Sequence, residues 1–446
     1  MEEEIITPQK KSWKIFQTRK GIALLIIIGI LVAGSASSYF IFKHKLSSDN
    51  SASISSAQNK DIYVQFLSEI WDTIKTSHWE KQQDDALANL YKLGTEKVIG
   101  KPVDVTPKTK EDVQAMTELA MKDMDATKKK EFATSLSDIV LANLKPFGRS
   151  RLFGQKQQED LKNTVENRDP NADLYATLDV EKDATKEEID KKYTEKVKTV
   201  DATKPEGKQE LAKLERAKNA LASPDARKAY DEIGVEPTVI TKLIKPDIFY
   251  MHITKVSPQT FDEFQKAANS TDKQNLKSLI IDLRGNIGGA VDILPYFLGP
   301  FIGPDNYAYD FFHQGEYTPY KTKIGWMPSL VKFKKVVVLI DGESQSSAEI
   351  MAATFKKYNV GIVVGTHTKG WGTIEQLMPV KTVLDSKESY SILMVHSLTL
   401  RDDGQPVEGK GVDPLINITD KDWDKQLMEY VSSSNLVEAV KGFIKK

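Results

Sequence analysis

The sequence contains no cysteine, which excludes a disulfide framework, a thiolate nucleophile and a cysteine-ligated zinc or iron–sulfur site. It also has no excess of either charge, because 62 lysines and arginines face 63 aspartates and glutamates. Proteins whose main task is to bind nucleic acid usually carry a basic excess, so we expect no nucleic-acid partner. The sequence has no His-Glu-x-x-His motif, aspartate-rich loop or phosphate-binding loop, and we therefore expect neither a metal nor a cofactor. Serine, lysine, histidine and carboxylate chemistry remain open.

A long apolar run near the start predicts a membrane anchor. Residues 21–42 carry no charge, and about 20 apolar residues suffice for a helix to cross the hydrocarbon core. Basic residues are frequent before this run and sparse after it. The positive-inside rule therefore predicts a cytoplasmic tail over 1–20, an anchor over 21–43 and an extracytoplasmic location for the rest. The alternative is a cleaved signal peptide, because small residues occupy 33–36. Apolar residues resume at 39–42, which favours the single-pass anchor of a bacterial membrane protein.

The part that follows predicts a helical domain over residues 60–165. A serine-rich stretch at 47–59 precedes it and is typical of a flexible tether. From Asp61 onward, apolar residues recur at three- and four-residue spacing, as in an amphipathic helix. Three further helices are expected, at about 83–99, 110–125 and 128–144. We interpret this domain as a packing scaffold without chemistry of its own.

Residues 171–235 predict a second helical unit. It opens with Leu-Tyr, begins its second helix after a capping Thr185, and closes with Ser-Pro followed by Arg-x-x-Tyr-Asp. Together these motifs resemble the J-domain family, whose members stimulate a chaperone ATPase through a His-Pro-Asp loop. Here the loop at 200–205 is Val-Asp-Ala-Thr-Lys-Pro. The resemblance therefore implies a structural or docking module that binds a protein partner, rather than a co-chaperone.

A third unit, over residues 239–418, alternates apolar strands with helices. Strands are expected at 248–253, 278–283, 336–340 and 360–364, and helices at 260–269 and 347–358. Apolar strands separated by helices predict an α/β core with a mostly parallel sheet. One or two amphipathic helices are expected within 419–446. The predicted fold class is thus α/β, with an α-helical N-terminal region and a small all-α J-like unit before the core.

Two turns of this core stand out, because active sites of α/β folds collect where strands end and helices begin. The first turn, at 282–289, ends in Gly288-Gly289, and paired glycines let backbone N–H groups approach an anion closely. The second, at 341–350, places serines at the start of a helix, where free N–H groups favour negative charge. Each turn alone also has a structural explanation, a tight bend in the first case and a helix-capping serine in the second.

In their order along the chain, the two turns resemble the C-terminal processing peptidase family, the tail-specific serine proteases. The family's Asp-Leu-Arg-x-Asn-Pro-Gly-Gly turn is present at 282–289 with Ile287 in place of proline. Its Ser-Ala-Ser-Glu turn is matched by Ser-Ser-Ala-Glu at 346–349, which implies that Ser346 attacks the scissile carbonyl. Its closing Gly-Lys-Gly-Ile-x-Pro-Asp pattern survives at 409–414 as Gly-Lys-Gly-Val-Asp-Pro.

The resemblance implies acyl-transfer chemistry on a peptide or unfolded segment of an exported protein. Ser346 would form an acyl-enzyme, and backbone N–H groups of Gly288 or Gly289 and of Ser347 would bind the oxyanion. The substrate would lie as an additional strand against a sheet edge. Where the family often has a peptide-binding PDZ domain, this chain has the J-like unit.

The general base of the family is altered in this chain. Family members use a Ser–Lys dyad, in which a lysine of lowered pKa takes the proton of the serine. That lysine normally lies in Thr-Phe-Gly-Lys-Gly, 25 residues after the serine, and Trp371 occupies this position here. An indole nitrogen only donates hydrogen bonds and cannot act as a base. The glutamine that usually follows four residues later is replaced by Glu375.

Three hypotheses for the base remain open. In the first, Lys369 acts, because residues two apart on extended backbone share a face and its four-carbon stem could then reach Ser346. In the second, a histidine acts, as in tricorn-like relatives, and the candidates are His252, His313, His367 and His396. In the third, the site is inactive and the chain is a pseudoprotease, which binds peptides or docks proteins at the cell envelope.

Overall fold

The computed structural model describes residues 61–446 apart from 202–203, 245, 272–274, 402 and 445–446. The predicted membrane anchor and the serine-rich tether lie outside this part of the chain. Among the residues that are described, no helix combines the length and the apolar character needed to cross a membrane.

The N-terminal region is helical, as the apolar spacing predicts. Its helices are α2 (Ile62–Ser77), α3 (Asp84–Ile99), α4 (Lys110–Met121) and α5 (Ala126–Ala142). Helix α4 ends four residues earlier than expected, because Asp125 caps the next helix by accepting a hydrogen bond from Lys128 N–H at 2.9 Å. The core of this region also takes in Ile392 and Met394, which come from a strand far along the chain, and Tyr390, which precedes that strand.

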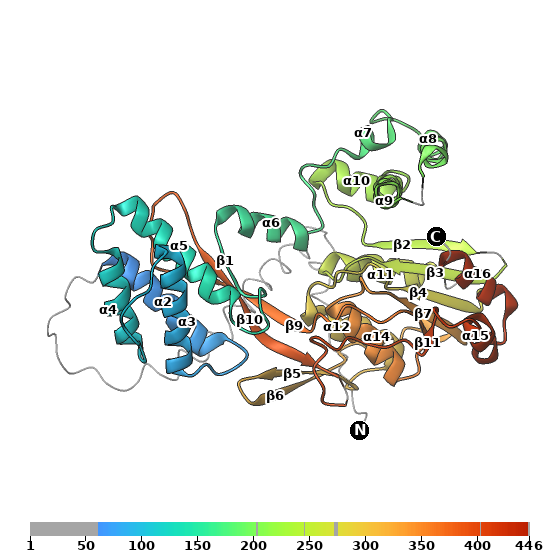
Figure 1. Ribbon diagram of the computed structural model, residues 1–446. Helices are drawn as coiled ribbons and strands as arrows, with labels where there is room; N and C mark the ends of the chain where they lie inside the picture. The colour runs from blue at the N-terminus through green and yellow to red at the C-terminus, as the bar shows by residue number, and fades with distance from the viewer. Residues whose placement is uncertain (1–60, 202–203, 245, 272–274, 402, 445–446) are drawn as a thin grey trace, which may run out of the picture. The chain divides into compact units, whose positions relative to one another are not determined.

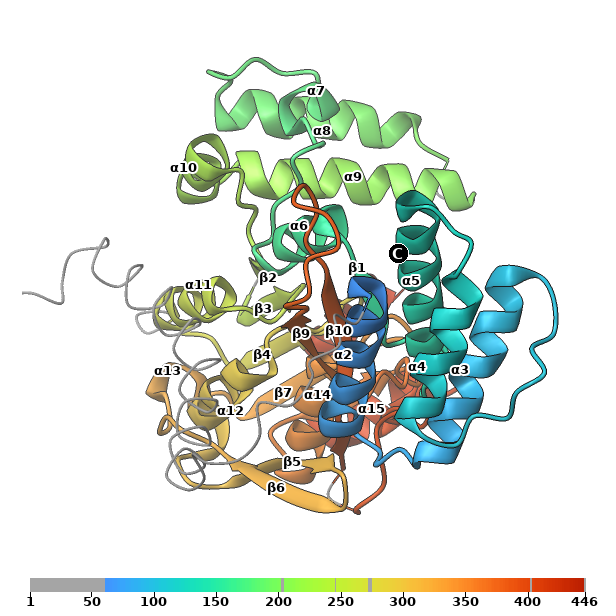
Figure 2. The ribbon, with the colours of Figure 1, turned by 90° about the vertical axis from the view of Figure 1, so that its left-hand side faces the viewer.

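Residues 173–233 form a small helical unit around a core of their own. Its helices are α7 (Leu174–Leu178), α8 (Lys186–Thr199), α9 (Pro205–Leu221) and α10 (Pro224–Ile233). The predicted cap at Thr185 is present as a capping box with Glu188, which fixes the start of α8. The two long helices, α8 and α9, lie side by side (Figure 2) and enclose Ile189 and Leu214.

The α/β core is built on a six-stranded sheet. In spatial order its strands are β11 (Ile416–Asn417), β8 (Ile362–Gly365), β7 (Lys335–Ile340), β4 (Ser278–Asp282), β3 (Ile248–Ile253) and β2 (Val239–Ile244). All neighbours are parallel except β2, which runs antiparallel to β3. The mostly parallel sheet expected from the apolar strands is therefore present (Figure 1).

Helices cover both faces of this sheet. On one face pack α11 (Pro258–Asn269), α12 (Leu294–Ile302) and α14 (Ser347–Lys357), and on the other α15 (Trp423–Val431) and α16 (Ser434–Ile444). Alternate residues of β7 illustrate the arrangement, because Val338 packs in the first core and Val337 in the second. Burial on both faces explains why these strands are apolar throughout.

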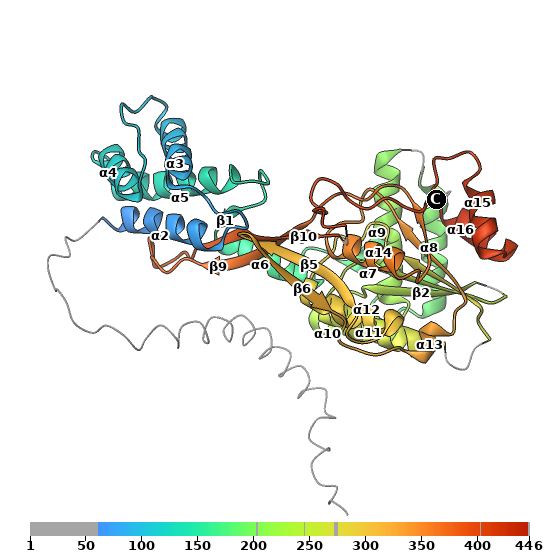
Figure 3. The ribbon, with the colours of Figure 1, turned by 90° about the horizontal axis from the view of Figure 1, so that it is seen from below.

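A second, antiparallel sheet was not predicted from the sequence. It contains β1 (Arg151–Phe153), β5 (Tyr307–His313), β6 (Glu316–Lys321), β9 (Thr373–Pro379) and β10 (Ser391–Leu400). The long strands β9 and β10 form a hairpin (Figure 3). One end of β10 packs into the core of the N-terminal helices, and the other end pairs with β5. The predicted boundary between a purely helical domain and the core is therefore bridged by this sheet.

The remaining short elements are α6 (Gln155–Val165), a 3-10 turn at Val291–Ile293 and α13 (Pro328–Val331).

Candidate functional site

The serine turn joins β7 to α14 and holds Ser346 in a strained backbone conformation. Ser346 has φ 55° and ψ −122°, a combination that residues with a side chain rarely adopt. Such strain persists only where the surrounding structure imposes it, and it is common at functional sites. Asp341 supplies part of this support, because its Oδ1 accepts hydrogen bonds from the backbone N–H groups of Glu343 (3.0 Å) and Ser344 (2.9 Å).

The diglycine turn after β4 lies directly against the serine turn. Gln345 N–H donates to the carbonyl of Asn286 at 3.0 Å, and Ser344 Oγ donates to the carbonyl of Leu283 at 2.8 Å. A Cβ atom placed on Gly288 would lie 2.6 Å from the Cβ of Ser346 and 3.0 Å from its Oγ. The hydroxyl of Ser346 therefore faces this turn, and only glycine leaves room for it.

The backbone donors of the two turns are not equally available. The N–H of Gly288 donates to Oδ1 of Asn286 at 2.8 Å, so it is already engaged. Within the described residues, the N–H groups of Gly289 and Ser347 make no hydrogen bond. Ser347 Oγ donates to the carbonyl of Gly289 at 3.0 Å, so the two residues whose N–H groups are free are hydrogen-bonded to each other through other atoms. Of the predicted oxyanion donors, Gly289 and Ser347 are thus the two whose N–H groups are not engaged within the described part of the chain.

A buried carboxylate connects the serine turn with the loop that follows β8. Glu349 is fully buried, and its Oε2 accepts from Ser346 N–H (2.9 Å) and from Trp371 N–H (2.8 Å). Its Oε1 accepts from Thr368 Oγ1 (2.5 Å) and Gly370 N–H (2.8 Å). Four donors converge on one side chain, and we call this group the Glu349 clamp. The clamp brings the backbone of Trp371 beside that of Ser346.

The side chain of Trp371 is covered by a residue that the sequence did not single out. The guanidinium of Arg149 lies 3.3 Å from the centre of the indole ring. Arg149 also pairs with Glu408 at 3.1 Å, and the other oxygen of Glu408 accepts from Gly372 N–H at 2.8 Å. The loop around Trp371 is thus fixed from two sides. No local signal in the sequence marks Arg149, because its partners lie more than 200 residues away.

Glu375, which replaces the glutamine of the family, lies beside the indole ring of Trp371. Its Oε1 accepts from Thr373 Oγ1 at 2.5 Å and from the indole N–H of Trp371 at 3.3 Å. Burial raises the pKa of Glu375, although both hydrogen bonds and the nearby Arg149 oppose the shift.

Lys369 is next to the serine turn, but its amine points to another partner. Its backbone N–H donates to the carbonyl of Ser344 at 3.0 Å. Its Nζ lies 3.3 Å from Oε2 of Glu343, and both side chains are partly exposed. The extended backbone expected between Lys369 and Trp371 is interrupted, because Gly370 has φ 77°. Across the described residues, no lysine or histidine side chain is hydrogen-bonded to the hydroxyl of Ser346.

The four candidate histidines have other partners. His252 Nε2 contacts the carbonyl of Arg284 at 3.1 Å, and His367 Nδ1 contacts Oδ1 of Asp413 at 2.7 Å. The rings of His313 and His396 stack with their centres 4.2 Å apart.

This histidine stack predicts a pH dependence of stability. Burial, with a smaller contribution from His313, lowers the pKa of His396 from 6.5 to about 4. The unfolded chain therefore binds this proton first, and the contribution of His396 to the free energy of unfolding is complete above pH 6.5 and is lost as the pH falls towards 4. We expect the variant His396→Gln to lose less stability than the wild type over this range in urea titrations. If the free energy of unfolding changes equally with pH in the variant and in the wild type, the prediction is contradicted.

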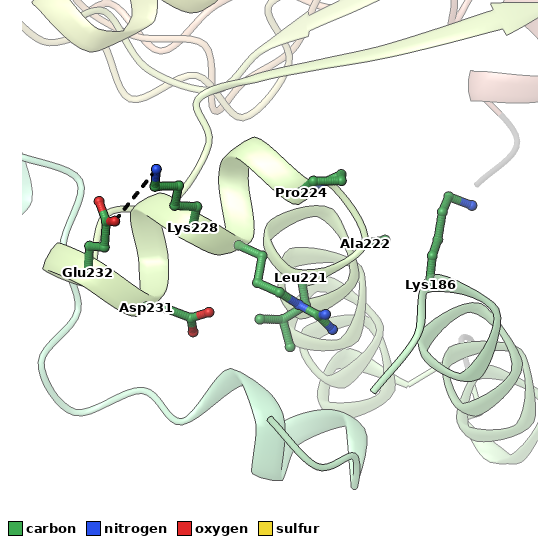
Figure 4. A pocket seen from close by; sticks show the side chains of 8 residues that line it. Lys186, Leu221, Ala222, Pro224, Lys228, Asp231 and Glu232 are labelled. Carbon is green, nitrogen blue, oxygen red and sulfur yellow. Dashed lines mark ion pairs between the residues drawn. The ribbon is translucent and has the colours of Figure 1, made fainter. Parts of the chain in front are cut away.

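The helical unit at 173–233 has a hollow of about 430 Å³ between its helices. Leu221, Ala222 and Pro224 form its apolar part, and charged side chains surround them (Figure 4). Arg227 donates to the carbonyl of Ala184 at 2.7 Å, and Lys228 pairs with Glu232 at 3.8 Å.

Comparisons with known proteins agree with both resemblances. Residues 247–418 match the model of peptidase family S41, and residues 173–231 match the DnaJ domain model. The carboxy-terminal processing proteases CtpB and CtpA of Bacillus subtilis are 28% and 27% identical to the chain over 175 and 217 residues. These matches cover 39% and 48% of this chain and 34% and 44% of the two relatives, so the chain spans less than half of their length. A solved photosystem II D1 C-terminal processing protease is 12% identical, with 84% of this chain and 98% of that chain covered and a TM-score of 0.47.

Proposed function

Because residues 247–418 belong to peptidase family S41 and residues 173–231 form a DnaJ domain, we propose that the chain is a serine peptidase that cleaves extended protein segments. Its nucleophile is Ser346. The observation that carries this proposal is the strained backbone of Ser346, which the Glu349 clamp maintains directly opposite the diglycine turn. A serine that only capped a helix would need neither the strain nor the glycine contact.

The reaction proceeds through an acyl-enzyme. Oγ of Ser346 attacks the scissile carbonyl carbon and gives its proton to the neutral amine of Lys369, while the carbonyl oxygen becomes an oxyanion. The N–H groups of Gly289 and Ser347 bind that oxyanion. The amine then returns the proton to the leaving nitrogen as the C–N bond breaks. A water molecule hydrolyses the ester in the same way and regenerates Ser346.

Lys369 is the base in this proposal because its backbone is already fixed beside the serine turn. Its amine must leave Glu343, whose side chain is 70% exposed. An ion pair exposed to this extent contributes about 0–1 kcal/mol, so substrate binding can break it.

A second candidate function is peptide binding without cleavage. The observation that favours it is the stack of Arg149 on Trp371, which fills the position of the family's base with two side chains that cannot accept a proton. In this case the diglycine turn and the serine turn would hold a peptide that is never cut.

The two candidates are separated by a cleavage assay with the full chain and a denatured, fluorescently labelled protein. We expect the wild type to cut, Ser346→Ala to be inactive, and Lys369→Met to lose at least about 100-fold in rate, the usual contribution of a general base. Lys381→Met, which removes an exposed lysine side chain in the loop between β9 and β10, is the matched control and should cut normally. Normal cutting by Lys369→Met would refute the assignment of Lys369 as the base. A wild type that binds the labelled protein but never cuts it would establish peptide binding without cleavage.

We propose further that the chain works on the outer side of the membrane, held by residues 21–43, and that substrate segments reach it there. The charge asymmetry around that run and its length support this placement. The DnaJ domain would bind a chaperone-type or other protein partner without stimulating an ATPase, since residues 200–205 do not contain His-Pro-Asp.

A further inference from the structure

The α/β core has a second hollow, at the edge of the sheet opposite to Ser346. Its volume is about 380 Å³. Lys334 and Lys335 lie where β7 begins, and Gly361 lies where β8 begins, whereas Ser346 follows the end of β7. Lys356, near the end of α14, and Asn359, which follows this helix, complete the polar part of the lining. We call this feature the lysine hollow.

The lysine hollow concentrates positive charge in a chain whose charges otherwise balance. Among the residues that the structure describes, three lysines line it and no aspartate or glutamate does. Lys335 Nζ donates to the carbonyl of Ser432 at 2.9 Å, and Lys356 Nζ to the carbonyl of Asp413 at 3.0 Å. These contacts orient the two ammonium groups without neutralising them, and each keeps further N–H donors. Lys334 has no ion-pair partner among the described residues.

Helix-end electrostatics account for two of the three lysines. A lysine in the last turn of α14 interacts favourably with the carbonyl end of the helix, which explains Lys356. Lys335, the first residue of β7, contacts the end of a second helix in the same way, because Ser432 is the C-cap residue of α15. Lys334, which precedes it, has no such contact among the described residues. Three cations from two separate segments are therefore brought together at one hollow, and a ligand with more than one negative charge can neutralise them together.

The other side of the hollow is apolar and unusually exposed. Leu415 is 45% exposed and Tyr430 is 57% exposed, and both line the hollow. An aromatic ring and an aliphatic side chain at the rim offer a contact surface for an apolar group attached to the anion.

We infer that the lysine hollow binds a phosphomonoester that carries an apolar or aromatic substituent. A phosphomonoester has a charge of about −1.5 to −2 near pH 7 and three acceptor oxygens, which suits several converging ammonium groups. Lysine binds phosphate as a point charge, whereas planar recognition of a single carboxylate favours arginine. The substituent lies over Tyr430 and Leu415. This site is separate from the peptidase site, and its occupation does not depend on cleavage.

The test is calorimetric titration of the full chain at low salt with three probes, which are inorganic phosphate, phenyl phosphate and phenylacetate. We expect phenyl phosphate to bind at least about tenfold more tightly than either of the others, because it alone combines both features. Lys334→Glu should weaken phenyl phosphate about tenfold or more, and it leaves the Lys335 contact with Ser432 intact. Tyr430→Ser should weaken phenyl phosphate but not inorganic phosphate.

The matched control is Lys182→Glu, which makes the same change of charge at a distant exposed site. It should bind phenyl phosphate as the wild type does. Circular dichroism and thermal unfolding of each variant exclude a loss of fold. Equal binding of phenyl phosphate and phenylacetate would overturn the inferred ligand class. Absence of saturable binding at millimolar phenyl phosphate, or equal weakening by Lys334→Glu and Lys182→Glu, would overturn the site.

Discussion

Replacement of Glu349 by glutamine is expected to lower the free energy of unfolding by about 2–4 kcal/mol and to remove the reactivity of Ser346. The substitution keeps the size of the side chain but turns one acceptor oxygen into a donor. Two backbone N–H groups, those of Ser346 and Trp371, share a single oxygen of this carboxylate. An amide group cannot accept from all four donors of the clamp, so at least one buried donor loses its partner.

The effect on reactivity follows from the same contact. The N–H bond from Ser346 to Glu349 maintains the strained φ of 55°. Without it, the turn is free to relax towards ordinary helix-capping geometry, and the hydroxyl would move away from the donors of Gly289 and Ser347. Urea denaturation measures the stability, and covalent labelling of Ser346 by a fluorophosphonate measures the reactivity.

The control for this prediction is Glu343→Gln, which makes the same chemical change three residues from Ser346. The Glu343 side chain is 70% exposed, so we expect a change within about 0.5 kcal/mol and no loss of labelling. Comparable losses in both variants would show that the clamp is not what holds the serine turn.

Replacement of Trp371 by lysine is expected to increase the labelling rate of Ser346, because an amine at this position need not leave Glu343 first, as the amine of Lys369 must. The clamp already brings the backbone of residue 371 beside Ser346. The new amine would also lie close to Arg149, which now covers the indole ring at 3.3 Å. A neighbouring cation lowers the pKa of an amine and so favours the neutral form that acts as a base.

Glu375 opposes this gain, because its carboxylate would pair with the new amine and favour its charged form. We therefore expect Trp371→Lys combined with Glu375→Gln to exceed Trp371→Lys alone. Trp371→Phe, which removes the indole N–H but adds no base, is the matched control and should label as the wild type does. An unchanged rate in the double variant would mean that position 371 does not face the serine hydroxyl.

The six-stranded sheet was predictable because its strands are buried on both faces. Ile280 and Val337, for example, pack on one side and Ile281 and Val338 on the other, which produces the continuous apolar runs seen in the sequence. Two strands of the antiparallel sheet lack such a signal. Its strand β6 is almost wholly exposed, and β1 has only three residues and pairs with residues more than 200 positions away. Pairing of this kind depends on the whole fold rather than on local pattern.

The candidate site also contains residues that the sequence predicts and residues that it does not. Ser346 and Glu349 could be recognised together, because a serine followed three residues later by glutamate is the pattern of a capping box. The resemblance of the two turns to the peptidase family indicated that Gly288 and Ser346 lie close together. The number of residues between them does not indicate this. Arg149 could not be predicted, since its stack on Trp371 joins the N-terminal region to the core. The ion pair of Lys369 with Glu343 was not predicted. The prediction assumed extended backbone between Lys369 and Trp371, and Gly370 interrupts that backbone.

The central claim is that Ser346 is an activated nucleophile in the unmodified chain. Intact-protein mass spectrometry of the full chain after reaction with a fluorophosphonate, followed by peptide mapping, tests it most directly. The account predicts one adduct, located on Ser346, that is absent in Ser346→Ala and much slower to form in Lys369→Met. A wild type that acquires no adduct, or an adduct on any other serine, would contradict it.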